Sequence, residues 1–147
     1  MTSRPRDAFG RPLPRDTDTP AEPDPEAMPA RETLQTASAL LREGRAFRAH
    51  EVFEAIWKAT EGDERELWRA LAQLAVGITH AQRGNARGSA ALLRRGAANL
   101  LPWDGTQPYG LPVSALRDWA TDGAGAPLPA EKLLAAMPPL VDPNDQG

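Results

Sequence analysis

Apolar residues recur with a helical period through most of the chain after Pro29. Spacings of three and four residues between apolar positions are typical of amphipathic α-helices. No segment alternates apolar and polar residues over the length of a strand, and β-branched residues are few. The pattern therefore predicts an all-α fold of about five or six helices. We expect them between Pro29 and Gly44 and at about 46–60, 63–81, 86–101, 113–120 and 130–137.

Glycines mark the expected turns. Gly44 and Gly84 stand where a glycine ends a helix, after the first and third predicted helices. Asp63 and Glu66 have the spacing of a capping box at the start of the third helix. That helix is apolar almost all round over residues 67–81, so we expect it to be the buried central helix. The short connections favour antiparallel helical hairpins.

A weak internal repeat surrounds the two glycine turns. Gly44-x2-Phe47-x-Ala49 is echoed about 40 residues later by a second helix–glycine turn–helix pattern that begins at Gly84. Helical hairpins of the tetratricopeptide kind pack in this way, although two units are fewer than a solenoid usually needs. The repeat therefore predicts a small helical bundle or array with tetratricopeptide-like packing.

Composition divides the chain into three parts. Residues 1–28 are rich in proline and charged residues, and their few large apolar side chains include Phe9 and Leu13. Such a segment buries too little apolar surface to offset its ordering entropy, which predicts a flexible tail. Phe9 and Leu13 are its candidate anchors to the domain surface. We expect one helical domain at 29–140, with its core at 31–101, and a loose C-terminus at 141–147.

Charge and composition narrow the classes of function. The formal net charge of −3 provides no global basic field, so nucleic-acid binding is not favoured. The absence of cysteine excludes disulfides and thiolate metal sites. No apolar run reaches the roughly 20 residues of a membrane span, and the N-terminus lacks the apolar core of a signal peptide. We expect a soluble cytoplasmic protein with no membrane partner.

The main candidate site lies on the second predicted helix. His50, Glu54 and Trp57 fall within about 60° of one another on a helical wheel, along the border of the apolar face. Glu51 points elsewhere on the same wheel, toward solvent. The apparent His-Glu-x-x-Glu signature therefore reduces to the pair of His50 and Glu54, which supplies only two metal ligands. A zinc protease of the His-Glu-x-x-His type needs a second histidine at the position of Glu54.

The third helix offers possible partners for that pair. Gln73 and His80 share one face of a helix that is otherwise apolar, and buried polar groups need partners. If the polar stripes of the two helices meet, His50, Glu54, Gln73 and His80 converge. His50, Glu54 and His80 would then suit a divalent metal such as Zn, Mn or Fe. A structural network and a metal-free ligand or catalytic site are the alternatives.

The same residues resemble a known bacterial and archaeal family, the domain-of-unknown-function family 309. Its hallmark is His-x3-Glu-x2-Trp or Tyr, present here as His50-x3-Glu54-x2-Trp57, and its Gly-Asn turn follows at Gly84. The resemblance covers about residues 34–101. It implies a small helical bundle and a motif for which metal binding is suggested, but it assigns no reaction.

Two functions remain open at this point. The first is a metal- or small-ligand-binding site formed by His50, Glu54 and Trp57, with Gln73 and His80 as further ligand-binding residues. The second is a non-catalytic helical interaction module, a homodimer or a partner-binding domain, in which His50 and Glu54 form a structural buried pair. Whether the protein is an enzyme is left open by the sequence.

Overall fold

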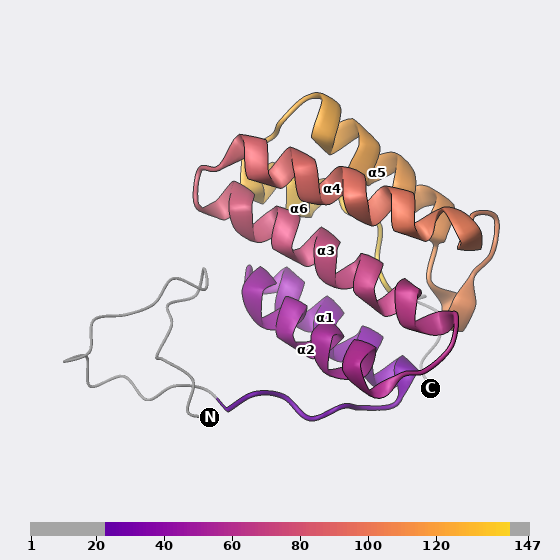
Figure 1. Cartoon of the computed structure of the whole chain (residues 1–147). Helices are drawn as coiled ribbons and strands as arrows, with labels where there is room; N and C mark the ends of the chain where they lie inside the picture. The colour runs from indigo at the N-terminus through magenta and orange to yellow at the C-terminus, as the bar shows by residue number, and fades with distance from the viewer. Residues whose placement is uncertain (1–22, 142–147) are drawn as a thin grey trace.

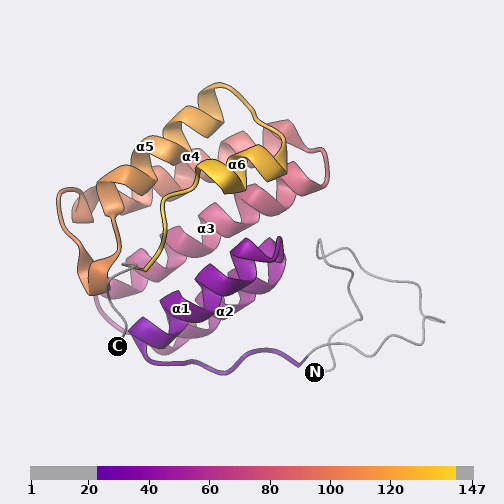
Figure 2. The same cartoon turned by 180° about the vertical axis from the view of Figure 1, so that it is seen from behind.

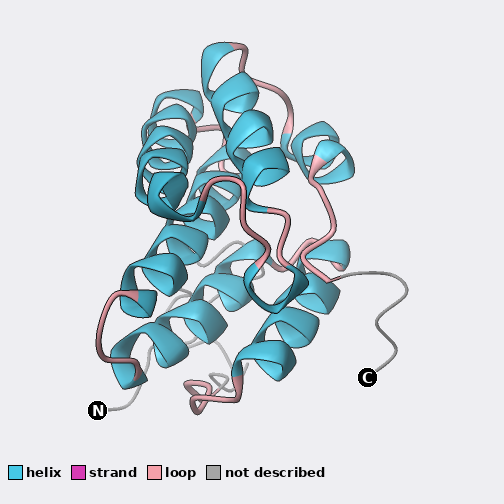
Figure 3. Cartoon of the chain, turned by 90° about the vertical axis from the view of Figure 1, so that its right-hand side faces the viewer, coloured by secondary structure: helices cyan, strands magenta, loops and turns pink. Residues whose placement is uncertain are grey.

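The structure is a computed structural model in which residues 23–141 are described. This range contains six α-helices, two short 3-10 turns and no strand (Figure 3). None of the helices in residues 23–141 has the length and apolarity needed to cross a lipid bilayer. The predicted all-α fold is confirmed. The α-helices are α1 (Ala30–Arg42), α2 (Ala46–Ala59), α3 (Glu64–Gln82), α4 (Ala86–Leu100), α5 (Val113–Gly125) and α6 (Ala130–Ala136), and the 3-10 turns are η1 (Leu101–Trp103) and η2 (Pro108–Gly110).

The helices form two layers. α2, α3 and α4 lie side by side on the face turned to the viewer in Figure 1. Seen from behind, α1, α6 and α5 lie in front of them (Figure 2). Each of the first four helices packs against the next one along the chain, and α6 returns to pack against α3. The chain is therefore an array of helical hairpins, as the short connections predict.

α3 is the central helix, as its apolar sequence predicts. It packs against α2, α4 and α6, and the side chains of Trp68 and Ile78 are completely buried. Small residues allow α4 to approach it closely. A Cβ atom at Gly96 would lie only 2.5 Å from the Leu74 side chain and 3.1 Å from the carbonyl oxygen of Ala70. Because α3 lies between two helices of its own layer, its polar side chains have two possible sets of partners.

The two glycine turns have the same backbone conformation, and a hydrogen bond links them. Gly44 has a φ of 75° and Gly84 a φ of 76°, in the left-handed region that favours glycine. Nε2 of Gln82, at the end of α3, donates a hydrogen bond of 2.7 Å to the carbonyl of Gly44. The internal repeat thus corresponds to two helical hairpins whose turns lie close together.

Two local predictions were wrong. The side chain of Asp63, which precedes α3, makes no capping hydrogen bond, so the capping box with Glu66 does not form. α5 continues past its predicted end to Gly125. A Cβ atom at Gly123 would lie 2.9 Å from the Leu133 side chain of α6, so this glycine permits close packing between the helices. Tertiary packing therefore extends α5 through residues of low helix propensity.

Most of the predicted N-terminal tail and nearly all of the predicted loose C-terminus lie outside the described residues. Residues 23–29 are described, and Met28 packs against the core. The carbonyl of Met28 accepts a hydrogen bond of 3.2 Å from Oγ1 of Thr33 in α1. From α1 this segment runs back along the α1–α2 hairpin, toward the end that carries the turn at Gly44 (Figures 1 and 2).

Candidate functional site

The polar residues of the motif interact along the side of α2. Nε2 of His50 lies 3.2 Å from Oε2 of Glu54, and Oε1 of Glu54 accepts a hydrogen bond of 2.9 Å from Nζ of Lys58. Each pair is four residues apart, which places the partners one turn apart on the helix. The exposed fraction of the side chain rises from 19% for His50 to 35% for Glu54 and 65% for Lys58. Both carboxylate oxygens of Glu54 are thus engaged within α2.

His50 is held as a neutral imidazole. Burial lowers its pKa below the ordinary value of 6.5, and this effect exceeds the opposing effects of the Glu54 charge and hydrogen bond. We therefore assign the proton to Nε2, which donates to Glu54. Nδ1 is buried and lacks a well-formed hydrogen bond, although the Phe47 backbone makes a smaller contribution that raises the pKa. The ring packs against Phe47, with centroids 5.3 Å apart. The nitrogen not bonded to Glu54 is therefore closed to solvent.

Trp57 lies beneath two arginines of α3. The guanidinium carbons of Arg65 and Arg69 are 5.1 and 6.0 Å from the centre of its ring, within the range of cation–π attraction. Arg69 is also 3.5 Å from Glu66 on its own helix. Nε1 of Trp57 is buried and has no hydrogen-bond partner among the described residues. Trp57, the last residue of the motif, is therefore covered by side chains of α3.

His80 is directed toward α4. Its Nδ1 lies 3.2 Å from Nδ2 of Asn85, the N-cap residue of α4, whose Oδ1 accepts a hydrogen bond of 2.9 Å from the Gly88 amide. A Cβ atom at Gly88 would lie 3.0 Å from Nδ1 of His80. Burial lowers the pKa of His80, and the charge of Arg83 lowers it further. His80 thus supports the start of α4.

Gln73 makes a corresponding contact two turns earlier, on the same face of α3. Its Oε1 accepts a hydrogen bond of 2.7 Å from Nδ2 of Asn99 in α4. The polar side chains of Gln73 and His80 on α3 therefore find their partners on the α4 side. Those of His50 and Glu54 are paired within α2. Among residues 23–141, no three histidine, cysteine, aspartate or glutamate side chains are grouped so that they could hold a metal ion. His50 and Glu54 are brought together, but His80 does not join them in such a group.

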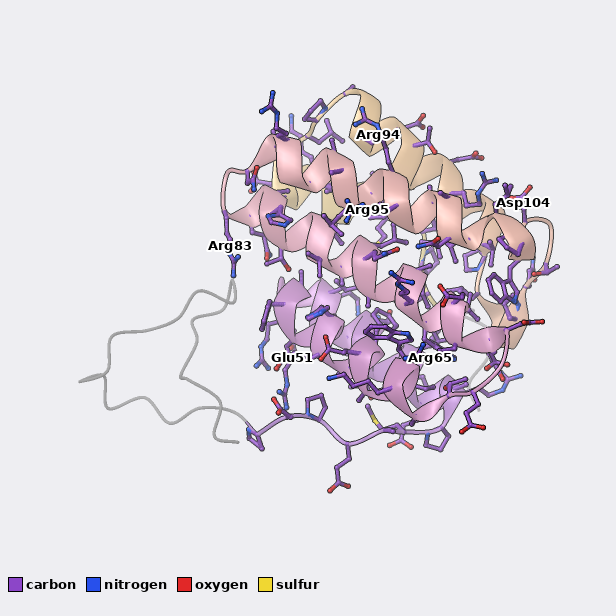
Figure 4. All side chains as sticks on the ribbon, in the orientation of Figure 1. Glu51, Arg65, Arg83, Arg94, Arg95 and Asp104 are labelled. Atoms are coloured by element: carbon purple, nitrogen blue, oxygen red, sulfur yellow. The ribbon has the colours of Figure 1, made fainter. Side chains whose placement is uncertain are left out.

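The remaining charged residues near the stripe are spread over the surface. Glu51 is 3.4 Å from Arg48 on its own helix, whereas His50 pairs with Glu54. Figure 4 shows Arg65, Arg83 and Arg95 at separate places along α3 and α4. Arg94, on α4, donates a hydrogen bond of 3.4 Å to the carbonyl of Ala124. These arginines do not gather into one basic patch in this view.

A cleft that no sequence pattern predicted lies away from the motif. It has a volume of about 750 Å³ and opens between the end of α1, α6 and the segment that follows α6. We call it the α1–α6 cleft. Most of its lining side chains are apolar, and three charged residues also line it. The apolar lining includes Leu41, Leu134, Met137, Leu140 and Val141, and the charged residues are Arg42, Glu43 and Glu131.

A second contact that sequence reasoning missed joins α3 to the η2 turn. The Tyr109 hydroxyl donates a hydrogen bond of 2.7 Å to Oε1 of Glu64, and the Tyr109 ring stacks on Trp68 with centroids 6.1 Å apart. Tyr109 has a φ of 56°, which is uncommon for a residue other than glycine. Tyr109 lies between the fourth and fifth predicted helices, where no sequence pattern indicates this contact.

The segment that contains His50, Glu54 and Trp57 matches a known family. The family model described as Domain of unknown function (DUF309) matches residues 34–92. This segment therefore matches the DUF309 family. The family predicted from the motif is therefore confirmed, although the match ends at residue 92, short of the expected 101. No curated protein and no solved structure matches the chain.

The DUF309 segment includes all five predicted site residues but only part of the α1–α6 cleft. Most of α1, all of α2 and α3 and the start of α4 lie within the match, whereas α6 and the residues after it lie outside. The motif and the cleft are therefore different features of the molecule. One belongs to the family segment, and the other depends on how the C-terminal helix packs against it.

Proposed function

We propose that this protein is a non-catalytic helical binding module that binds an extended, basic peptide with apolar anchor residues in the α1–α6 cleft. The observation that supports this proposal is an open cleft of about 750 Å³ lined mainly by apolar side chains. Sites of roughly 300–1,000 Å³ with such a lining are typical of specific ligand binding. The proposal treats the pair of His50 and Glu54 as a structural element of α2.

The partner's anchors follow from the lining. Leu41, Leu134 and Met137 offer contacts to apolar side chains. Methionine is unbranched and adapts its shape, which suits a surface that binds apolar anchors of more than one shape. Pro138 and Pro139 lack backbone N–H donors, so this part of the wall favours side-chain contacts over β-type pairing with the peptide.

The partner's charge follows from the charged residues of the cleft. Glu43 and Glu131 outnumber Arg42, and all three side chains are exposed. The cleft also includes the C-terminal end of α1, where the helix dipole adds partial negative charge. Positive side chains beside the anchors therefore complement the cleft, and a peptide with acidic flanks is disfavoured.

Fluorescence polarisation tests this function. The probe is a fluorescein-labelled peptide of repeated Arg-Pro-Leu-Pro units, titrated with the full chain. We expect saturable binding that Leu134→Asp weakens more than tenfold, because an uncompensated charge enters the apolar wall. Leu128→Asp is the matched control, since Leu128 is 41% exposed and is not a lining residue. Equal binding by the two variants would overturn the proposal, and so would an absence of binding by both the wild type and the Phe9→Ser/Leu13→Ser chain.

A second candidate function is a small-anion site at the motif. It is favoured by the buried Nε1 of Trp57, which has no partner beneath Arg65 and Arg69. In this function a carboxylate or phosphate accepts hydrogen bonds from the indole and the guanidinium groups, and His50 and Glu54 fix the helix around it. Titration with inorganic phosphate, followed by the indole N–H resonance of Trp57, tests it. A resonance shift lost in Arg65→Gln supports the site, and an unchanged resonance rules it out.

A further inference from the structure

We propose that residues 4–16 of this chain occupy the α1–α6 cleft of the same molecule, so that the binding module is closed by its own N-terminal segment until a partner displaces it. The inference rests on the proposed function, because the same cleft takes both the internal segment and the partner. Residues 4–16 lie outside the described residues.

The sequence of this segment has the chemistry that the cleft favours. Phe9 and Leu13 provide two large apolar anchors, and the prolines at positions 12 and 14 restrict the backbone around Leu13 to extended conformations. Four arginines accompany two aspartates, so the segment is basic although the whole chain carries a formal charge of −3. The arginines are Arg4, Arg6, Arg11 and Arg15.

The described chain that precedes α1 leads toward the end of the hairpin at which the cleft lies. The described chain before α1 runs back along the α1–α2 hairpin toward the end with the Gly44 turn, and Gly44 itself lines the cleft (Figure 2). The stretch from Leu13 to Pro23 spans up to about 35 Å when extended. α1, with 13 residues, is about 20 Å long. The stretch that carries the anchors is therefore longer than α1, along which the described segment already runs back (Figure 2).

Opposite charges favour the contact between this segment and the cleft. The exposed carboxylates of Glu43 and Glu131 lie beside the apolar lining, so arginines that flank Phe9 and Leu13 meet opposite charge. Residues 142–147 also leave the cleft wall at Val141, but they contain no large apolar side chain and two aspartates. They are therefore a poor match for the same lining.

Because residues 4–16 are covalently attached to the domain, they would occupy the cleft most of the time even if their intrinsic affinity for it is weak. A short flexible linker gives an effective concentration in the millimolar range, so a segment with an intrinsic Kd of about 0.1 mM fills the cleft about nine-tenths of the time. A partner then binds the remaining open fraction, and its apparent affinity falls about tenfold. The segment thus sets a threshold for partner binding.

Paramagnetic relaxation in the full chain tests the contact. Because the chain has no cysteine, Ala135→Cys places a single nitroxide on an exposed residue of the cleft wall. We expect it to broaden the amide resonances of Phe9 and Leu13. A nitroxide at Glu61→Cys, beyond the opposite end of α2, is the control and should leave them sharp. Reversing the cleft charges with Glu43→Lys and Glu131→Lys should reduce the broadening severalfold.

The outcomes separate this inference from the proposed function. Broadening that is absent, or equal from both label positions, overturns self-occupation. Broadening seen only when labelled chains are mixed with unlabelled isotope-enriched chains assigns the contact to a second copy and also overturns it. The fluorescein-labelled peptide should bind the Phe9→Ser/Leu13→Ser chain about tenfold more tightly than the wild type. Equal, saturable binding by both retains the function but rejects self-occupation, whereas no binding by either rejects the function.

Discussion

His50 and Glu54 form a closed pair on α2, with 3.2 Å between Nε2 of the imidazole and Oε2 of the carboxylate. The second oxygen of Glu54 is bonded to Lys58, and the second nitrogen of His50 is buried. A general base needs a free nitrogen within reach of its substrate, and a metal ligand needs a free lone pair. The described geometry leaves neither of these open, which is why we assign binding to the α1–α6 cleft.

We predict that His50→Ala lowers the free energy of unfolding by about 1–2 kcal/mol, because it removes a hydrogen bond to a charged group and the packing against Phe47. Urea denaturation at pH 7.5 measures this change. His50→Gln keeps a side-chain donor and should lose less. An unchanged stability in both variants would contradict a structural role for the pair.

The pH dependence follows from the lowered pKa of His50. Because the folded-state pKa lies below the ordinary value of 6.5, the folded protein binds fewer protons than the unfolded chain in this range. The stabilising contribution is therefore complete above pH 6.5 and is lost as the pH falls through the folded-state pKa. We expect the free energy of unfolding to fall between pH 7.5 and 5.5.

His50→Gln should make that fall smaller, and the lowered pKa of His80 should account for part of what remains. Urea denaturation of both proteins at the two pH values measures the difference. A steeper fall in His50→Gln than in the wild type would show that the sign assigned to His50 is wrong.

Metal content tests the sequence-based expectation of a Zn, Mn or Fe site. His80 is engaged with Asn85, and His50 with Glu54, so the expected three-ligand set is not assembled. We expect elemental analysis of protein purified without chelators to find less than one metal ion in ten chains. A stoichiometric metal that His50→Ala removes would contradict this account and restore the metal site.

Close packing between α3 and α4 predicts opposite effects for two glycine substitutions. Gly96→Ala should destabilise the fold by about 1–3 kcal/mol, because the new Cβ atom would meet Leu74 and the backbone of Ala70. Gly125→Ala is the matched control at the end of α5, where no atom lies within 4 Å of the added methyl group. It should be neutral or stabilise by up to about 1 kcal/mol. Thermal denaturation ranks the two, and an equal loss would contradict the packing.

Tyr109→Phe tests the contact between η2 and α3. The substitution removes the hydrogen bond to Glu64 but keeps the ring on Trp68. We expect a loss of about 0.5–1.5 kcal/mol in the free energy of unfolding. Glu64→Gln provides the other arm of a double-mutant cycle, in which the two losses should not add. Fully additive losses would show that the bond contributes nothing.

Local patterns predicted the fold well where each pattern depends on one or two helices. Apolar spacing and the glycines at 44 and 84 gave the first four helices, because these signals act within single turns. The wheel position of His50 relative to Glu54 likewise predicted their contact, since one helix carries both residues. The extra length of α5 was missed because it depends on packing between Gly123 and Leu133 of α6.

The partners of α3 were not predictable in the same way. A central helix has neighbours on both sides, and the sequence does not say which neighbour a polar face meets. Gln73 and His80 were expected to meet α2, but their hydrogen bonds go to Asn99 and Asn85 on the α4 side. The α1–α6 cleft was missed for a related reason, since it exists only when α6 and the following segment pack beside α1.

The most direct test of the central claim compares two variants in the same binding experiment. His50→Gln changes the motif and Leu134→Asp changes the α1–α6 cleft, and each is titrated with the fluorescein-labelled Arg-Pro-Leu-Pro peptide at a temperature where both are folded. If the cleft is the binding site, His50→Gln binds within about twofold of the wild type and Leu134→Asp binds more than tenfold more weakly. The reverse pattern, with binding lost in His50→Gln and retained in Leu134→Asp, would contradict this account.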